Sequence, residues 1–266
     1  MEISFVNDEY STSIDAAVEF ANKNNLKYIE LRNINSQNIT DINDMEAYTI
    51  SSKIAQSGIL VSSIASPFLF WHQQENNFSI NGHKTTSEED YFNYLMDLAD
   101  IFGAPNISIY SYLKSNDMDI SNLGEIFDKY SQTALTRGIN LTLNIDDNCN
   151  IANINQMHKL FENYNFSNIH PLINTGKIIA QSADCSPEKL QDLINICDYF
   201  HLSDYDTQLQ RNVVLGEGNV DFASILHQKL NDNYTFASLA PATTHPEDLK
   251  MSLNILEDWL ISLEDE

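Results

Sequence analysis

Short runs of apolar residues alternate along this chain with longer segments whose apolar residues recur every three to four positions. The short runs are typical of buried β-strands and the longer segments of amphipathic helices. The expected strands are 3–7, 28–34, 60–67, 106–113, 141–148, 169–175, 199–205 and 235–241. The expected helices are 13–25, 42–56, 87–102, 122–137, 154–164, one that begins at Ser186-Pro187-Glu188, 221–230 and 246–263. Eight strand–helix units of roughly 30 residues each predict a single (β/α)8 TIM barrel over residues 1–266.

Local signals support several of these boundaries. Pro67 ends the third strand, Ser87 with Asp90 begins a helix as an N-cap, and Gly138 closes another helix. A polar insertion, residues 71–86, precedes the helix at Ser87. An open doubly wound sheet is the alternative, but no G-x-G-x-x-G motif follows the first strand and eight units suffice to close a barrel.

The strand at 141–148 carries polar side chains on one of its faces. Leu141, Leu143 and Ile145 alternate with Thr142, Asn144 and Asp146, and Asp147 and Asn148 follow. Polar side chains on a buried strand are costly unless they have partners. Since TIM-barrel sites lie at the carboxyl ends of the strands, we expect a functional site at this end of the barrel.

The composition excludes several classes of partner. The chain has 14 Lys and Arg against 38 Asp and Glu, a formal net charge of −24. Such a surface repels phosphate backbones and anionic lipid, so we expect no nucleic-acid or membrane-surface binding. With 42% hydrophobic residues, the chain can bury a substantial core.

Cys149, Cys185 and Cys197 show no C-x-x-C spacing, which indicates reduced thiols rather than a zinc ribbon. No signal peptide is apparent, and no apolar run is long enough to span a bilayer. The expectation is a cytoplasmic protein, and the sequence does not indicate an oligomeric state.

Six segments, in order along nearly the whole chain, resemble the xylose-isomerase-like TIM barrels, the sugar phosphate isomerases and epimerases. They are Tyr28-Ile29-Glu30-Leu31-Arg32, Val61-Ser62-Ser63-Ile64-Ala65-Ser66-Pro67, Phe102-Gly103-Ala104-Pro105, Asp147-Asn148-Cys149-Asn150, Phe200-His201-Leu202-Ser203-Asp204 and Leu215-Gly216-Glu217-Gly218-Asn219-Val220-Asp221-Phe222. The last segment is the most specific, because its glycines, its acid and Val-Asp-Phe occur together before a helix.

This resemblance implies a divalent metal held by glutamate, aspartate, histidine and glutamate at four strand ends, which polarises the substrate's oxygens. The corresponding positions here are Asn144, Asn174, His201 and Ala240, so that the histidine alone is kept. Hard cations prefer anionic oxygen ligands. Asp146 would restore a single carboxylate. Although a divalent metal is the family default, we therefore expect no metal and no other cofactor, and an isomerase centre that has largely been lost.

Lys177 lies three residues after Asn174, where the resembled family often has histidine or asparagine. We hypothesise that its ammonium replaces part of the metal's charge and holds an anionic or polyhydroxylated ligand. The alternative is a solvated loop lysine. Lys177, His201 and Asp146 are accordingly the candidate catalytic residues.

Other polar residues of the expected strand ends are candidates for binding a small carbohydrate or sugar phosphate. Glu30 and Arg32 form an internal ion pair or contact a ligand, and His201 binds a sugar hydroxyl or remains as a relic beside Asp204. Glu217 contacts a ligand or orders its own loop through backbone N–H groups. The expected substrate-binding residues are Glu30, Arg32, Asn144, Asn174, Lys177, His201 and Glu217.

Less specific candidates lie nearby. Phe70, Trp71 and His72 follow the third strand and either stack on a sugar ring or pack against one another, and His245 could partly refill the site.

Three functions fit this pattern. The first is a carbohydrate- or polyol-binding barrel with altered or absent isomerase activity. The second is an active isomerase or epimerase on a small sugar or keto acid that uses no metal or a rearranged site. The third is a partner-binding pseudoenzyme.

Overall fold

Eight parallel strands form the barrel in the computed structural model, which describes residues 1–75, 77–80, 83–85, 87–115, 118–181, 186–229, 235–243 and 245–264. Their order around the sheet is β1-β14-β11-β10-β9-β8-β5-β2, and a parallel bridge between Val6 and Glu30 brings β1 next to β2. The strands are β1 (Glu2–Phe5), β2 (Tyr28–Leu31), β5 (Leu60–Ala65), β8 (Asn106–Ile109), β9 (Asn140–Leu143), β10 (Ile169–Asn174), β11 (Tyr199–Leu202) and β14 (Phe236–Leu239).

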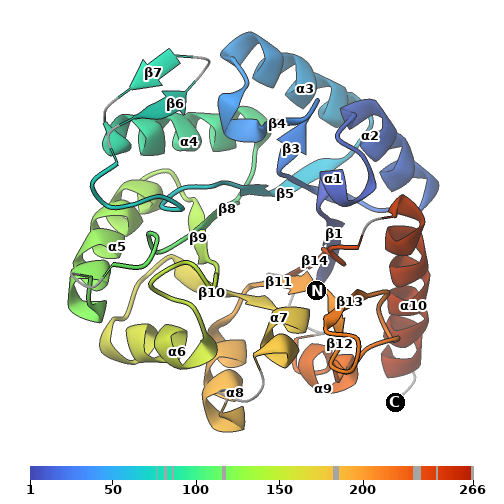
Figure 1. Cartoon of the computed structure of the whole chain (residues 1–266). Coiled ribbons are helices and arrows are strands. Elements are labelled where there is room, and N and C mark those ends of the chain that lie inside the picture. The colour runs from blue at the N-terminus through green and yellow to red at the C-terminus, as the bar shows by residue number, and fades with distance from the viewer. Residues whose placement is uncertain are drawn as a thin grey trace.

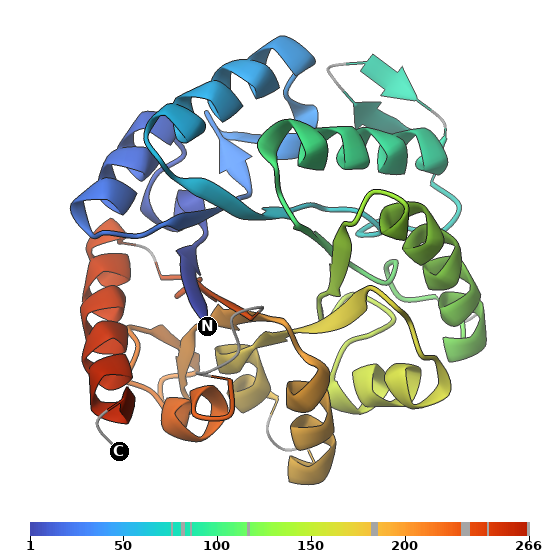
Figure 2. The same cartoon turned by 180° about the vertical axis from the view of Figure 1, so that it is seen from behind.

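Helices surround the strands on the outside, as Figures 1 and 2 show from opposite sides. They are α2 (Ile14–Lys23), α3 (Asp44–Gln56), α4 (Glu88–Phe102), α5 (Ile120–Leu135), α6 (Ile154–Asn163), α8 (Pro187–Ile196), α9 (Phe222–Leu226) and α10 (Pro246–Glu264). Their apolar faces and the strands share one buried core that includes Phe5, Ile29, Leu95, Leu141 and Phe200. The predicted (β/α)8 barrel is confirmed, and the open sheet is wrong.

Several expected elements differ in detail. The second expected strand divides into β2 and the short β3 (Asn33–Ile34), which pairs with β4 (Gln37–Asn38). The seventh divides into β11 and β12 (Asp204–Asp206), which pairs with β13 (Arg211–Val213). The insertion after β5 contains a hairpin of β6 (Phe78–Ile80) and β7 (His83–Thr85).

Three short helices were not expected: α1 (Asn7–Tyr10), α7 (Thr175–Ala180) and a 3-10 turn at Ile39–Asp41. The helix expected at 221–230 is the shorter α9, and residue 230 lies outside the described residues, as does Cys185.

Side-chain caps fix the starts of α4 and α3, and the first of these was predicted from the sequence. The Ser87 hydroxyl accepts a hydrogen bond from the backbone N–H of Asp90 at 3.1 Å. Asn43 and Glu46 form a reciprocal capping box at the start of α3. Gly138 follows α5 with a φ of +68°, a conformation that favours glycine.

Polar side chains occupy the interior of the barrel. The hydroxyls of Ser4 and Ser62 are 2.7 Å apart, and the Ser62 hydroxyl is 2.9 Å from that of Tyr199. Tyr199 donates in turn to the carboxylate of Glu30 at 3.0 Å. These contacts provide hydrogen bonds for groups that would be costly to bury alone. No helix in the described part of the chain is long and apolar enough to cross a membrane.

Candidate functional site

A pocket of about 320 Å³ opens at the carboxyl ends of the barrel strands. It is lined by Arg32 after β2, Ala65 at the end of β5, Asn144 after β9, Asn174 and His201 at the ends of β10 and β11, and Ala240 after β14. TIM-barrel sites occur at this end because the loops there are free to vary. This pocket, which we call the mouth pocket, lies at the end of the barrel where the sequence predicts a functional site.

The four positions at which the resemblance implies metal ligands line this one pocket. Asn144, Asn174, His201 and Ala240 all contribute to its wall. The Asn174 Oδ1 accepts hydrogen bonds from the Lys177 backbone N–H at 2.9 Å and from the Ser203 hydroxyl at 2.8 Å. Asn174 is thus the N-cap of α7, and its oxygen is engaged by the chain itself.

Lys177 is partly buried in the mouth pocket rather than solvated on a loop. Its side chain is 24% exposed, and Nζ donates to the Ile145 carbonyl at 2.9 Å and lies 3.5 Å from Asp146 Oδ2. The other Asp146 oxygen accepts from the backbone N–H of Asn148 at 2.9 Å. One oxygen of Asp146 thus faces Lys177, while the other stabilises the turn at residues 146–148.

Close packing against the strand-end loops holds Lys177 in this position. Gly176 donates its backbone N–H to the Ser203 hydroxyl at 3.1 Å. A Cβ on Gly176 would lie 2.6 Å from that oxygen and 3.2 Å from the Ser203 backbone. Only glycine allows α7 to approach so closely.

His201 lies directly above the buried carboxylate of Glu30. Its Nε2 is 3.0 and 3.1 Å from the two carboxylate oxygens, and Glu30 is completely buried. Burial alone raises the pKa of the Glu30 carboxyl, but the charge and hydrogen bond of His201, with the hydrogen bond from Tyr199, outweigh it and hold the pKa below its usual value. Of the two alternatives for His201, the relic paired with Asp204 is corrected: the partner of His201 is Glu30.

Arg32 lines the mouth pocket but does not pair with Glu30. Its Nε is 2.8 Å from Asp8 and its Nη2 is 2.8 Å from Glu9. Both carboxylates lie in α1, directly after β1, and Glu9 also accepts the backbone N–H of Ala242 at 2.9 Å. The ion pair between Glu30 and Arg32 that the sequence suggested is therefore not formed. Arg32 pairs with the two acids of α1, whereas Glu30 pairs with His201.

Asp204, not Glu217, orders the glycine-containing loop that follows β13. The buried Asp204 carboxylate accepts backbone N–H groups of Gly216 and Gly218 at 2.9 Å and of Val220 at 3.0 Å. Glu217 is exposed and lies outside the wall of the mouth pocket. The loop-ordering role considered for Glu217 thus falls to Asp204.

Tyr110 and Phe70 form an aromatic wall of the mouth pocket. Their ring centroids are 4.8 Å apart, and the Asn144 amide donates to the Tyr110 hydroxyl at 3.4 Å. Burial raises the pKa of Tyr110 to about 12, so this hydroxyl stays protonated at neutral pH. The sequence reasoning missed Tyr110, although it follows Asn106 and Ser108 at the period of a strand.

The other aromatic and histidine candidates lie elsewhere. The Trp71 indole donates to Glu88 at 2.9 Å and packs against Phe68 and Phe78. His72 and His245 are exposed, and neither lines the mouth pocket. Of the aromatic residues singled out from the sequence, Phe70 alone contributes to this wall.

The donors in the mouth pocket do not fit a divalent cation. Ala240 has no ligand atom, the Asn174 oxygen and His201 Nε2 face protein partners, and an ammonium stands among them. Divalent metals bind sets of anionic or imidazole ligands. In the ranges that the structure describes, no group of three or more His, Cys, Asp or Glu residues could hold a metal ion.

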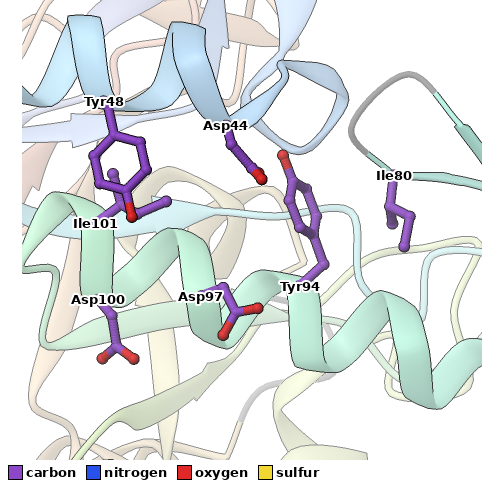
Figure 3. Close-up of a pocket in the computed structure, with 7 residues that line it drawn as sticks. All are labelled: Asp44, Tyr48, Ile80, Tyr94, Asp97, Asp100 and Ile101. Carbon is purple, nitrogen blue, oxygen red and sulfur yellow. The ribbon is translucent and has the colours of Figure 1, made fainter.

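A second pocket lies between α3 and α4, away from the strand ends (Figure 3). Its wall includes Tyr48, Tyr94, Asp97 and Asp100. Arg137 already contacts Asp97 at 2.7 Å and Asp100 at 2.9 Å. Since these acids are matched by a cation of the chain, the mouth pocket remains the candidate functional site.

The barrel has the fold of the xylose-isomerase-like TIM barrels. One similar solved structure is the probable 3-DHS dehydratase AsbF involved in petrobactin synthesis from Bacillus anthracis, with a TM-score of 0.75 and 16% identity over 97% of this chain and 99% of that one. A D-tagatose 3-epimerase-like protein has a TM-score of 0.74 and 13% identity over 100% and 99% of the two chains. The IOLI protein with a binding zinc atom has a TM-score of 0.74 and 13% identity over 99% of each chain. No family model and no curated protein match the sequence.

Proposed function

We propose that this protein binds a small carbohydrate or polyol in the mouth pocket, and that Lys177 acts where the resembled enzymes use a divalent metal. The observation that carries the proposal is the position of Lys177 Nζ, 2.9 Å from the Ile145 carbonyl in a wall shared with Asn144 and Asn174. An ammonium has three donor hydrogens, and these two protein acceptors leave one for a ligand oxygen.

The surroundings of Lys177 suit hydroxyl groups. The Asn144 amide and the Tyr110 hydroxyl both donate and accept hydrogen bonds, and Phe70 supplies an apolar surface. Small-ligand sites typically combine a few placed polar groups with such surface. The similarity of the fold to structures described as a sugar epimerase-like protein and a xylose isomerase domain protein also supports a sugar-like ligand.

The hydrogen bonds of the candidate bases support altered or absent isomerase activity. Moving a hydrogen between neighbouring sugar carbons requires a base with a free basic atom beside the substrate. His201 Nε2 is engaged by Glu30, Glu9 by Arg32 and Ala242, and Asp146 by Asn148 and Lys177. A binding protein therefore fits these contacts better than an isomerase that uses Lys177, His201 and Asp146.

Calorimetric titration with a panel of sugars and polyols, with and without EDTA, tests this proposal. We expect binding that EDTA does not change, a Lys177→Met variant that loses at least roughly tenfold in affinity, since one hydrogen bond to a charged group contributes about 1.5–3 kcal/mol, and no turnover of the panel. Lys129→Met, which removes a lysine paired with Glu89 on the surface, is the control and should bind normally. Unchanged affinity in Lys177→Met, or binding that requires metal, would refute the proposal.

A further inference from the structure

We propose that the mouth pocket selects uncharged polyols and rejects their phosphorylated or acidic forms. This inference rests on the proposed function and adds the charge class of the ligand. It follows from the way in which each cation in the wall of the pocket is matched by a carboxylate of the chain.

The first cation is Arg32, whose Nε and Nη2 bind Asp8 and Glu9. The side chains of these two acids are only 9% and 6% exposed, whereas Arg32 is 37% exposed. Two buried carboxylates around one guanidinium leave this corner of the pocket with a net negative charge. A phosphate approaching Arg32 would be repelled by Asp8 and Glu9 at short range, where screening by salt is weak.

The second cation is Lys177, which Asp146 neutralises from 3.5 Å. Both side chains are about a quarter exposed, at 24% and 26%, so the pair meets the ligand as a neutral unit. The pair below it, Glu30 with His201, adds no free positive charge. Among the described residues of the wall, Arg32 is the only arginine and Lys177 the only lysine, and each is paired with a carboxylate.

The remaining groups suit a neutral ligand. The Tyr110 hydroxyl remains a hydrogen-bond donor, and Asn144 offers an amide beside it. The Phe70 ring is 37% exposed and lines the pocket, so that it can cover the C–H face of a ligand. A dianion that binds here would lose its hydration, which is unfavourable. Since Arg32 and Lys177 are already paired, they would not compensate for that loss.

Binding of matched pairs of probes tests the inference: myo-inositol against its monophosphate, and fructose against fructose 6-phosphate, each by isothermal titration. We expect the neutral member of a pair to bind at least roughly tenfold more tightly, the equivalent of 1.4 kcal/mol. Asp146→Asn frees the Lys177 ammonium and should reduce or reverse the preference. Asp147→Asn removes the same charge from the exposed neighbouring residue, which lies outside the pocket wall, and should leave the preference unchanged.

The outcomes separate this inference from the proposed function. A phosphorylated probe that binds as tightly as its neutral partner, or an unchanged preference in Asp146→Asn, overturns the inference while the proposed function stands. If none of the four probes, nor any member of the wider sugar panel, binds at millimolar concentration, the proposed function fails and the inference fails with it.

Discussion

His201 Nε2 lies 3.0 Å from the carboxylate of Glu30, so a side chain of β11 contacts a side chain of β2 inside the barrel. In the resembled enzymes the corresponding histidine is expected to bind the metal. Here the ring nitrogen is directed instead at a carboxylate that is completely buried. Removal of one partner from a buried ion pair strongly destabilises the fold, because the other partner remains as a buried charge without a counter-charge.

Glu30→Gln should therefore destabilise the protein by about 3 kcal/mol at pH 7. The pKa of Glu30 is lowered in the folded state, so its ionised form stabilises the fold above the unfolded value of 4.5. That contribution is lost as the pH falls through the lower, folded pKa. The stability difference between wild type and Glu30→Gln should accordingly shrink below pH 4.5, where the unfolded carboxyl takes up its proton.

Urea unfolding of the two proteins at pH 7, 5, 4 and 3 measures this difference. Glu2→Gln, at the partly exposed start of β1, provides a control that removes one carboxylate without a buried partner. A difference between wild type and Glu30→Gln that stays constant across this range would show that the ionised pair does not contribute to stability.

The second prediction concerns the loop that follows β13. Asp204→Ala removes an acceptor for four backbone N–H groups, that of Tyr205 beside it and those of Gly216, Gly218 and Val220 in the loop, and should lower the free energy of unfolding by about 3 kcal/mol. Glu217→Ala, in the same loop but exposed, should change it by less than about 0.5 kcal/mol. Equal effects of the two substitutions in urea unfolding would contradict the assignment of loop order to Asp204.

The sequence predicted the barrel because each strand and helix is encoded locally, by runs of apolar residues and by caps such as Ser87 with Asp90. The mouth pocket was predicted in part, since parallel strands bring Asn144, Asn174 and His201 to one end. The partners of Glu30 and Arg32 could not be predicted in this way. Glu30 meets His201 from 171 positions away, and such pairing depends on tertiary structure rather than on local pattern.

Helix α7 shows that one short pattern of residues can carry two different local signals. Asn174 and the backbone of Lys177 form an N-cap, a pattern that predicts a helix start. The same residues also resemble an altered metal motif, which by itself gives no reason to expect a helix at this position. Both interpretations concern Asn174, but the cap decides where its oxygen points, and this in turn directs Lys177 into the pocket.

The last prediction addresses the metal directly, through a combined variant in which Asn144→Glu, Asn174→Asp and Ala240→Glu restore the three carboxylates and Lys177→Ala removes the ammonium. With His201, these side chains would supply the four ligands that the resemblance implies, in a wall that they already share. Affinity for a hard cation rises with the number of anionic ligands, so we expect the variant to bind Mn²⁺ on the order of a hundredfold more tightly than wild type. Asn174→Asp alone is a useful intermediate, because aspartate can keep the N-cap of α7 while it adds one charge.

Two measurements compare the variant with the wild-type protein: elemental analysis after dialysis, and Mn²⁺ titration followed by electron paramagnetic resonance. Stoichiometric manganese, zinc, cobalt or magnesium in the wild-type protein would mean that the mouth pocket holds a metal without these carboxylates, and the role proposed for Lys177 would then be wrong.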